Sequence, residues 1–187
     1  MNRTNPRHYA TLVALIATVA GASLAHADDA QPAVWTQKEV SFTYYGFTTK
    51  YTCDGLRDKV RGLMLKLGAR KDDLKVQRTG CSSATGHPDP FPGVRIKASV
   101  LQPAGADAEK PVQAQWQSLT FNASPAAILD RGDCELVEQL KQKVLPIFTT
   151  RNVEIIPSCI PHQLPTAGTI LKLDVLMAPA AAKVATK

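Results

Sequence analysis

Apolar residues follow two different periods, one after the other, in the first half of the chain. Residues 40–52 are rich in β-branched and aromatic side chains and predict a strand. After Cys53 the period becomes helical, because apolar residues recur on one face at positions 56, 60, 63, 64 and 67. Gly68 suits a left-handed helix C-terminus. Residues 74–78 and the alternating residues 94–100 predict two more strands.

The same order of elements recurs in the second half. Residues 112–121 alternate as a strand in which we expect Trp116 to be a core anchor. Cys134 opens a helical pattern that Pro146 ends. Residues 153–156 and 171–177 predict the last two strands. Helix phase, loop lengths and cysteine positions therefore agree between the two halves.

This repetition predicts a tandem β-α-β-β duplication within one domain, residues 40–178, with halves at 40–104 and 112–178. The alternative is that a chain with helices, strands and four cysteines shows some parallelism without a common origin. The expected fold class is α+β. We expect a two-layer sandwich with a sheet of about six antiparallel or mixed strands and both helices on one face. Its topology would be related to the ferredoxin-like β-α-β-β-α-β order, with strands added.

The N-terminal residues have the pattern of a secretory signal peptide. Arg3 and Arg7 precede the apolar residues 11–25, and residues 25–27 supply a small-x-small cleavage site. The alternative, a retained membrane anchor, is disfavoured because the apolar run is shorter than the roughly 20 residues that a bilayer span needs. We expect cleavage before Asp28 and a periplasmic or secreted protein. Residues 28–39 are then expected to be an N-terminal lead, polar over residues 28–32, and residues 179–187 a flexible tail.

Four cysteines in an exported chain predict disulfides rather than free thiols. In a right-handed β-α-β crossover both strands end at the same edge of the sheet, so we expect the pairs Cys53–Cys81 and Cys134–Cys159. Each closes a loop of about 25–30 residues, for which loop-closure entropy suggests roughly 3–4 kcal/mol of stabilisation. The chain has no C-x-x-C redox motif, and the spacings are too long for a typical four-cysteine zinc site.

Candidate catalytic chemistry is sparse. The sequence has no nucleophile elbow, phosphate-binding loop or dinucleotide fingerprint, so we assign no catalytic residue and no cofactor, and a non-enzymatic role is favoured. His87 and Asp89 lie in one proline-rich loop, and His162 lies in the corresponding loop of the second half. If the two loops converge, these three side chains could bind a divalent metal.

Two pairs of carboxylates look structural. Residues 72–73 belong to a helix-to-strand turn, and Asp130 and Asp133 flank a helix start, where acids suit the helix dipole and the N-cap. Residues 131–133 also spell the tripeptide RGD, which some adhesion ligands display on a mobile loop. Because Asp133 adjoins a cysteine at a helix start, we expect it to be held in place instead.

The chain carries a formal charge of +6, which falls to +4 when the two arginines of the signal peptide are removed. This excess is mild and dispersed, and aromatic residues do not alternate with basic ones, so nucleic-acid binding is not expected. Basic residues gather on the first helix and the turn after it. They form either a solvated helix face or a site for an anionic envelope ligand, and they are Arg57, Lys59, Arg61, Lys66, Arg70 and Lys71.

We therefore expect a small exported, non-enzymatic protein that binds a partner or an anionic ligand in the cell envelope. The alternative is a metal-binding protein or hydrolase that uses His87, Asp89 and His162. No segment after the signal peptide is expected to span a membrane. The edge strands of the sheet offer a route to a homodimer.

Overall fold

The computed structural model describes residues 30–82, 87–123, 128–157, 159–160, 163 and 168–179. These residues form six strands, two α-helices and two short 3-10 helices. In chain order the elements are β1 (Gln31–Thr43), α1 (Cys53–Lys66), η1 (Lys71–Asp73), β2 (Lys75–Thr79), β3 (Gly93–Pro103), β4 (Val112–Phe121), α2 (Cys134–Lys143), η2 (Leu145–Ile147), β5 (Thr150–Ile156) and β6 (Ile170–Met177).

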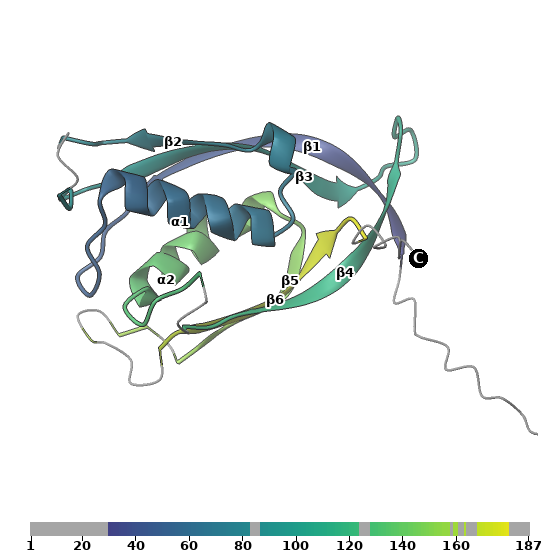
Figure 1. The fold of residues 1–187 in the computed structure, drawn as a ribbon. Helices are drawn as coiled ribbons and strands as arrows, with labels where there is room; N and C mark the ends of the chain where they lie inside the picture. The colour runs from purple at the N-terminus through teal and green to yellow at the C-terminus, as the bar shows by residue number, and fades with distance from the viewer. Residues whose placement is uncertain are drawn as a thin grey trace, which may run out of the picture.

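The strands form one sheet in the order β2-β3-β1-β4-β6-β5, and every neighbouring pair is antiparallel. Because β1 and β2 both pair with β3, they run parallel to each other, and β4 and β5 are related in the same way across β6. Both helices lie on the same side of the sheet, which curves around them (Figure 1). The predicted two-layer α+β sandwich is confirmed.

The two halves meet where β1 pairs with β4. Within the described chain this pairing covers only Gln31–Ala33 and Val112–Ala114, two ranges whose residue numbers differ by 81. The pairing is antiparallel, so its register is self-complementary about Pro32 and Gln113, and a pseudo-twofold axis passes between these two residues. A duplication would produce this arrangement, but the common origin itself stays a prediction.

The main core lies between the helices and the sheet. Leu56, Val60 and Leu63 of α1 are at most 1% exposed, on the face that the helical period predicts. A second, smaller apolar cluster lies on the opposite face of the sheet at the β1–β4 junction, because successive strand residues point to opposite faces. Trp116 is half-buried and packs against this second cluster, so it contributes to a core cluster but not to the main core.

β1 differs most from its predicted bounds. The N-terminal lead expected at residues 28–39 is already part of the strand from Gln31 onward, and the strand ends at Thr43 instead of residue 52. Pairing with β3 runs from Ala33 to Thr43, and main-chain pairing does not require apolar side chains. Residues 44–52, called the β1–α1 loop below, connect the strand to the helix. Among the described residues, no helix is both long and apolar enough to cross a bilayer.

Candidate functional site: a groove beside strand β1

Both disulfides are present with the predicted pairing. Cys53, the first residue of α1, is bonded to Cys81, which follows β2, and Cys134 at the start of α2 is bonded to Cys159 after β5. The reason is the one expected from the topology, since β1 and β2 run parallel and end at the same edge of the sheet. Two disulfides and no free cysteine among the described residues indicate an oxidising, extracytoplasmic environment. The predicted signal peptide and its cleavage site lie outside the described residues.

The predicted metal ligands are only partly described. Asp89 is 2% exposed, and its carboxylate accepts hydrogen bonds from the Ser82 backbone N–H at 2.9 Å and from the Ser82 hydroxyl at 3.1 Å. It also lies close to the sulfurs of Cys53 and Cys81, but these are bonded to each other and are not thiolate ligands. His87 is exposed. His162 lies outside the described residues, so the convergence of the two loops stays a prediction.

Two of the basic residues predicted as an anion-binding face are held by acids of the same chain. The Arg57 guanidinium lies 2.6 Å from the Asp54 carboxylate. The Lys59 side chain is only 13% exposed, and its ammonium lies 2.5 Å from Asp130 and 2.6 Å from Asp133. Desolvated and paired in this way, Lys59 has little charge to offer a ligand.

The other four residues of that set are held less closely by acids of the chain. The Arg70 guanidinium lies 3.7 Å from the Asp73 carboxylate and 5.9 Å from the centre of the Trp35 ring, beside the second apolar cluster. Arg61 is half-buried, whereas Lys66 and Lys71 are exposed. Within the described chain these last three make no ion pair at 4.0 Å or less. Anion binding by the predicted set of six therefore stays a prediction, with fewer free charges than the sequence indicated.

Asp133 is the centre of a buried polar cluster that joins the two halves. It is fully buried and accepts hydrogen bonds from the Tyr51 hydroxyl, from Lys59 and from the backbone N–H of Asp130, the last at 2.7 Å. Burial, followed by the Asp133 carboxylate, raises the pKa of Tyr51 above its usual range. Asp133 is the N-cap residue of α2, as predicted, but its side chain makes no capping hydrogen bond to the helix. The expectation that Asp133 of the RGD tripeptide is held in place is confirmed.

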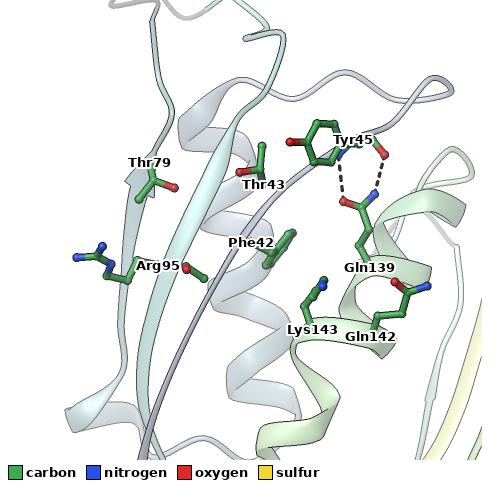
Figure 2. Close-up of a pocket in the computed structure, with 9 residues that line it drawn as sticks. Phe42, Thr43, Tyr45, Thr79, Arg95, Gln139, Gln142 and Lys143 are labelled. Carbon is green, nitrogen blue, oxygen red and sulfur yellow. Dashed lines mark hydrogen bonds between the residues drawn. The ribbon is translucent and has the colours of Figure 1, made fainter.

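The same helix, α2, also holds the β1–α1 loop of the other half. Glu135 is 8% exposed, and its carboxylate accepts hydrogen bonds from the backbone N–H groups of Phe47 and Thr48 at 2.9 and 3.1 Å. One turn later, the Gln139 side chain accepts from the Tyr45 N–H at 3.0 Å and donates to the Tyr45 carbonyl at 2.6 Å (Figure 2). Sequence patterns carry no signal for these contacts, because polar residues on a helix ordinarily face water.

A groove of about 670 Å³ opens beside the end of β1. Figure 2 shows its nine lining residues, with α2 on one side of β1 and with β2 and β3 on the other. The lining includes two cations, Arg95 and Lys143, and no carboxylate; its nine residues are Ser41, Phe42, Thr43, Tyr45, Thr79, Arg95, Gln139, Gln142 and Lys143. Sequence reasoning missed this site because it joins residues about a hundred positions apart.

Exposed aromatic side chains stand at this end of the molecule. Tyr45, Phe47 and Phe91 are 60%, 62% and 56% exposed. The rings of Tyr45, which lines the groove, and Phe91 pack against each other with centroids 5.6 Å apart. Isolated exposed aromatic residues are common on protein surfaces, but aromatic residues are also enriched at binding surfaces. The pair formed by Tyr45 and Phe91 therefore matters because Tyr45 lines the groove.

The described lining of the groove offers several kinds of contact for a ligand. Its hydroxyls belong to Ser41, Thr43, Thr79 and Tyr45, and the described lining offers no histidine or carboxylate that would act as a general base. Its ligand contacts would be hydrogen bonds to hydroxyls and amides, apolar contact with Phe42, and attraction to two cations. Comparison with protein-family models, with curated proteins and with solved structures gives no match.

Proposed function

We propose that this protein is a small, non-enzymatic binding protein of the cell envelope that takes an acidic partner in the groove beside β1. On this view the N-terminal signal peptide exports the chain and is removed before Asp28. The observation that carries the proposal is the charge of the groove: its nine described residues include Arg95 and Lys143 and no acid. Complementary charge gives specificity and speeds association with an acidic partner.

The surroundings of the groove strengthen the charge argument. Arg95 also lines a smaller hollow of about 170 Å³ together with Lys75, Lys97 and one acid, Glu39, which lies 3.8 Å from Arg95. The Lys143 side chain makes no ion pair with any described residue. Two disulfides and the hydrogen bonds from α2 to the β1–α1 loop favour a preformed groove. A preformed groove reduces the conformational entropy that is lost when a ligand binds.

A peptide selection with charge-reversed variants tests this proposal. Random linear octapeptides are displayed and selected on the oxidised protein, and the affinity of the strongest binders is measured for the wild type, for Lys143→Glu and for Lys141→Glu. Lys141 is the matched control, because it is an exposed lysine of the same helix that does not line the groove. We expect acidic peptides whose affinity falls at least tenfold, or about 1.4 kcal/mol, in Lys143→Glu alone.

Three results would contradict the proposal. They are the absence of any selected peptide, selection of basic peptides, and an equal loss of affinity in both lysine variants. The alternative of a metal-binding protein or hydrolase has weaker support, since the Asp89 carboxylate is buried and bonded to Ser82.

A further inference from the structure

We infer that the occupant of the groove is an extended polypeptide segment that joins the sheet as a strand along the open edge of β1. This inference rests on the proposed function, because it states how the same groove would hold its acidic partner. Three observations carry it: the direction of the β1 backbone groups, the contact between Gln139 and Tyr45, and the charge of the lining.

The backbone hydrogen bonds show which residues of β1 face the open edge. The Tyr44 N–H donates to the Pro92 carbonyl at 2.8 Å, and the Pro32 carbonyl accepts from Ala104 at 3.0 Å, so even-numbered residues face the β3 side. Backbone groups of successive strand residues point to opposite neighbours. The N–H and C=O groups of Ser41 and Thr43 therefore face away from β3, toward the edge that β4 leaves uncovered within the described chain.

Gln139 already imitates a neighbouring strand at the end of this edge. Its side-chain amide both accepts from the Tyr45 N–H and donates to the Tyr45 carbonyl, at 3.0 and 2.6 Å. Two such bonds exchanged with one residue are the pattern of a hydrogen-bonded antiparallel pair. A peptide strand would repeat this pattern at Thr43 and Ser41, the next two residues along the same edge that line the groove.

The dimensions and charge of the groove fit a short acidic strand. Residues 41–45 span about 14 Å at a rise of about 3.4 Å per residue, so four or five peptide residues would lie along them. In strand addition the main chain supplies affinity and alternate side chains supply specificity. A second copy of this chain is disfavoured at this edge, because it would bring Arg95 and Lys143 of both copies together. The partner is therefore an acidic segment of another protein.

Amide hydrogen exchange, measured by NMR on the intact oxidised protein, tests the strand. The probe is the strongest octapeptide from the selection described above. In the free protein we expect the amides of Ser41 and Thr43 to exchange at least tenfold faster than those of Phe42 and Tyr44, which face β3. With peptide bound, Ser41 and Thr43 should become at least tenfold more protected, and Phe42 and Tyr44 should change little.

Backbone N-methylation of the same peptide gives an independent readout. Methyl groups on one alternate set of peptide nitrogens should weaken binding at least tenfold, because these nitrogens donate to β1, whereas the other set should tolerate them. If the peptide binds in a Lys143-dependent way but neither readout responds, strand addition is wrong and the proposed function stands. If no peptide binds while vesicles containing phosphatidylglycerol bind through Lys143, both proposals are overturned in favour of a lipid surface.

Discussion

The Lys59 ammonium lies at nearly equal distances from two carboxylates that differ in burial. Removing each carboxylate in turn therefore separates the effect of burial on stability from the effect of distance. Its nitrogen is 2.6 Å from Asp133 and 2.5 Å from Asp130. The Asp133 side chain is completely buried, whereas that of Asp130 is 73% exposed. If distance set the contribution, Asp133→Ala and Asp130→Ala would cost the same. If desolvation sets it, the two variants will differ strongly.

The expected magnitudes follow from what each substitution leaves behind. Asp133→Ala removes the partner of a lysine that is 13% exposed, and it deprives the Tyr51 hydroxyl and the Asp130 N–H of their acceptor. Breaking a buried ion pair from one side costs about 3–5 kcal/mol. Asp130→Ala removes an exposed pairing, for which about 0–1 kcal/mol is typical. We therefore expect the free energies of unfolding of the two variants to differ by roughly 2–5 kcal/mol.

Urea unfolding of the oxidised proteins at pH 7, followed by circular dichroism, measures this difference. With a denaturant dependence of about 2 kcal/mol per molar, the midpoint should fall by roughly 1.5–2.5 M for Asp133→Ala and by less than about 0.5 M for Asp130→Ala. Asp133→Asn separates charge from shape, because the amide keeps one acceptor oxygen. Equal midpoints for the two alanine variants, or a wild-type midpoint for Asp133→Asn, would show that burial does not set the contribution of this ion pair.

Three further predictions concern pH, the loop and the disulfides. Burial raises the pKa values of Tyr44 and Tyr51 above the usual 10, so both stay protonated in the folded chain while they ionise in the unfolded one. The contribution of these tyrosines to the free energy of unfolding should therefore be fully present below about pH 10 and fall above it by about 1.4 kcal/mol per pH unit for each tyrosine. Tyr51→Phe should halve the slope of the urea midpoint against pH. Glu135→Ala should speed amide exchange at residues 47–48 at least tenfold and lower stability by about 2–4 kcal/mol, whereas exposed Glu154→Ala should do neither. Replacing both cysteines of either disulfide with serine should cost about 3–4 kcal/mol in urea unfolding, and a loss below 1 kcal/mol would show that the closed loops are already ordered in the unfolded chain.

Most of the architecture could be predicted from the periodicity of apolar residues and from the right-handedness of β-α-β crossovers. The helix starts at Cys53 and Cys134 were found because the period changes there from two to 3.6 residues. The disulfide pairing followed because parallel strands joined by a helix end at one edge of the sheet. Gly68 has a φ of +90°, as its predicted position at the end of α1 requires. These features depend on local sequence and on handedness, which is why the sequence carries them.

The features that could not be predicted from the sequence depend on contacts between the two halves. Glu135 reads as a solvated helix residue, yet it is buried because the β1–α1 loop of the other half covers it. Asp133 is the N-cap residue, as predicted, but its carboxylate accepts from Tyr51 and Lys59 of the other half and not from the helix. The groove was missed for the same reason, since Lys143 and Thr43 become neighbours only when the halves pack. Periodicity within one element contains no information about such partners.

Equivalent positions in the two halves differ beside the groove. Lys143, which lines the groove, stands 81 positions after Gly62, where an added Cβ would collide with Ile128 Cδ1. Ile128 therefore packs directly on the α1 backbone. Its own equivalent, 81 positions earlier, is Phe47, which is 62% exposed. An apolar side chain thus covers α1 in one half, whereas in the other half the equivalent Phe47 is largely exposed, with the Lys50 ammonium 5.5 Å from the centre of its ring. The two halves therefore differ at this pair of positions, and the lysine at one of them lines the groove.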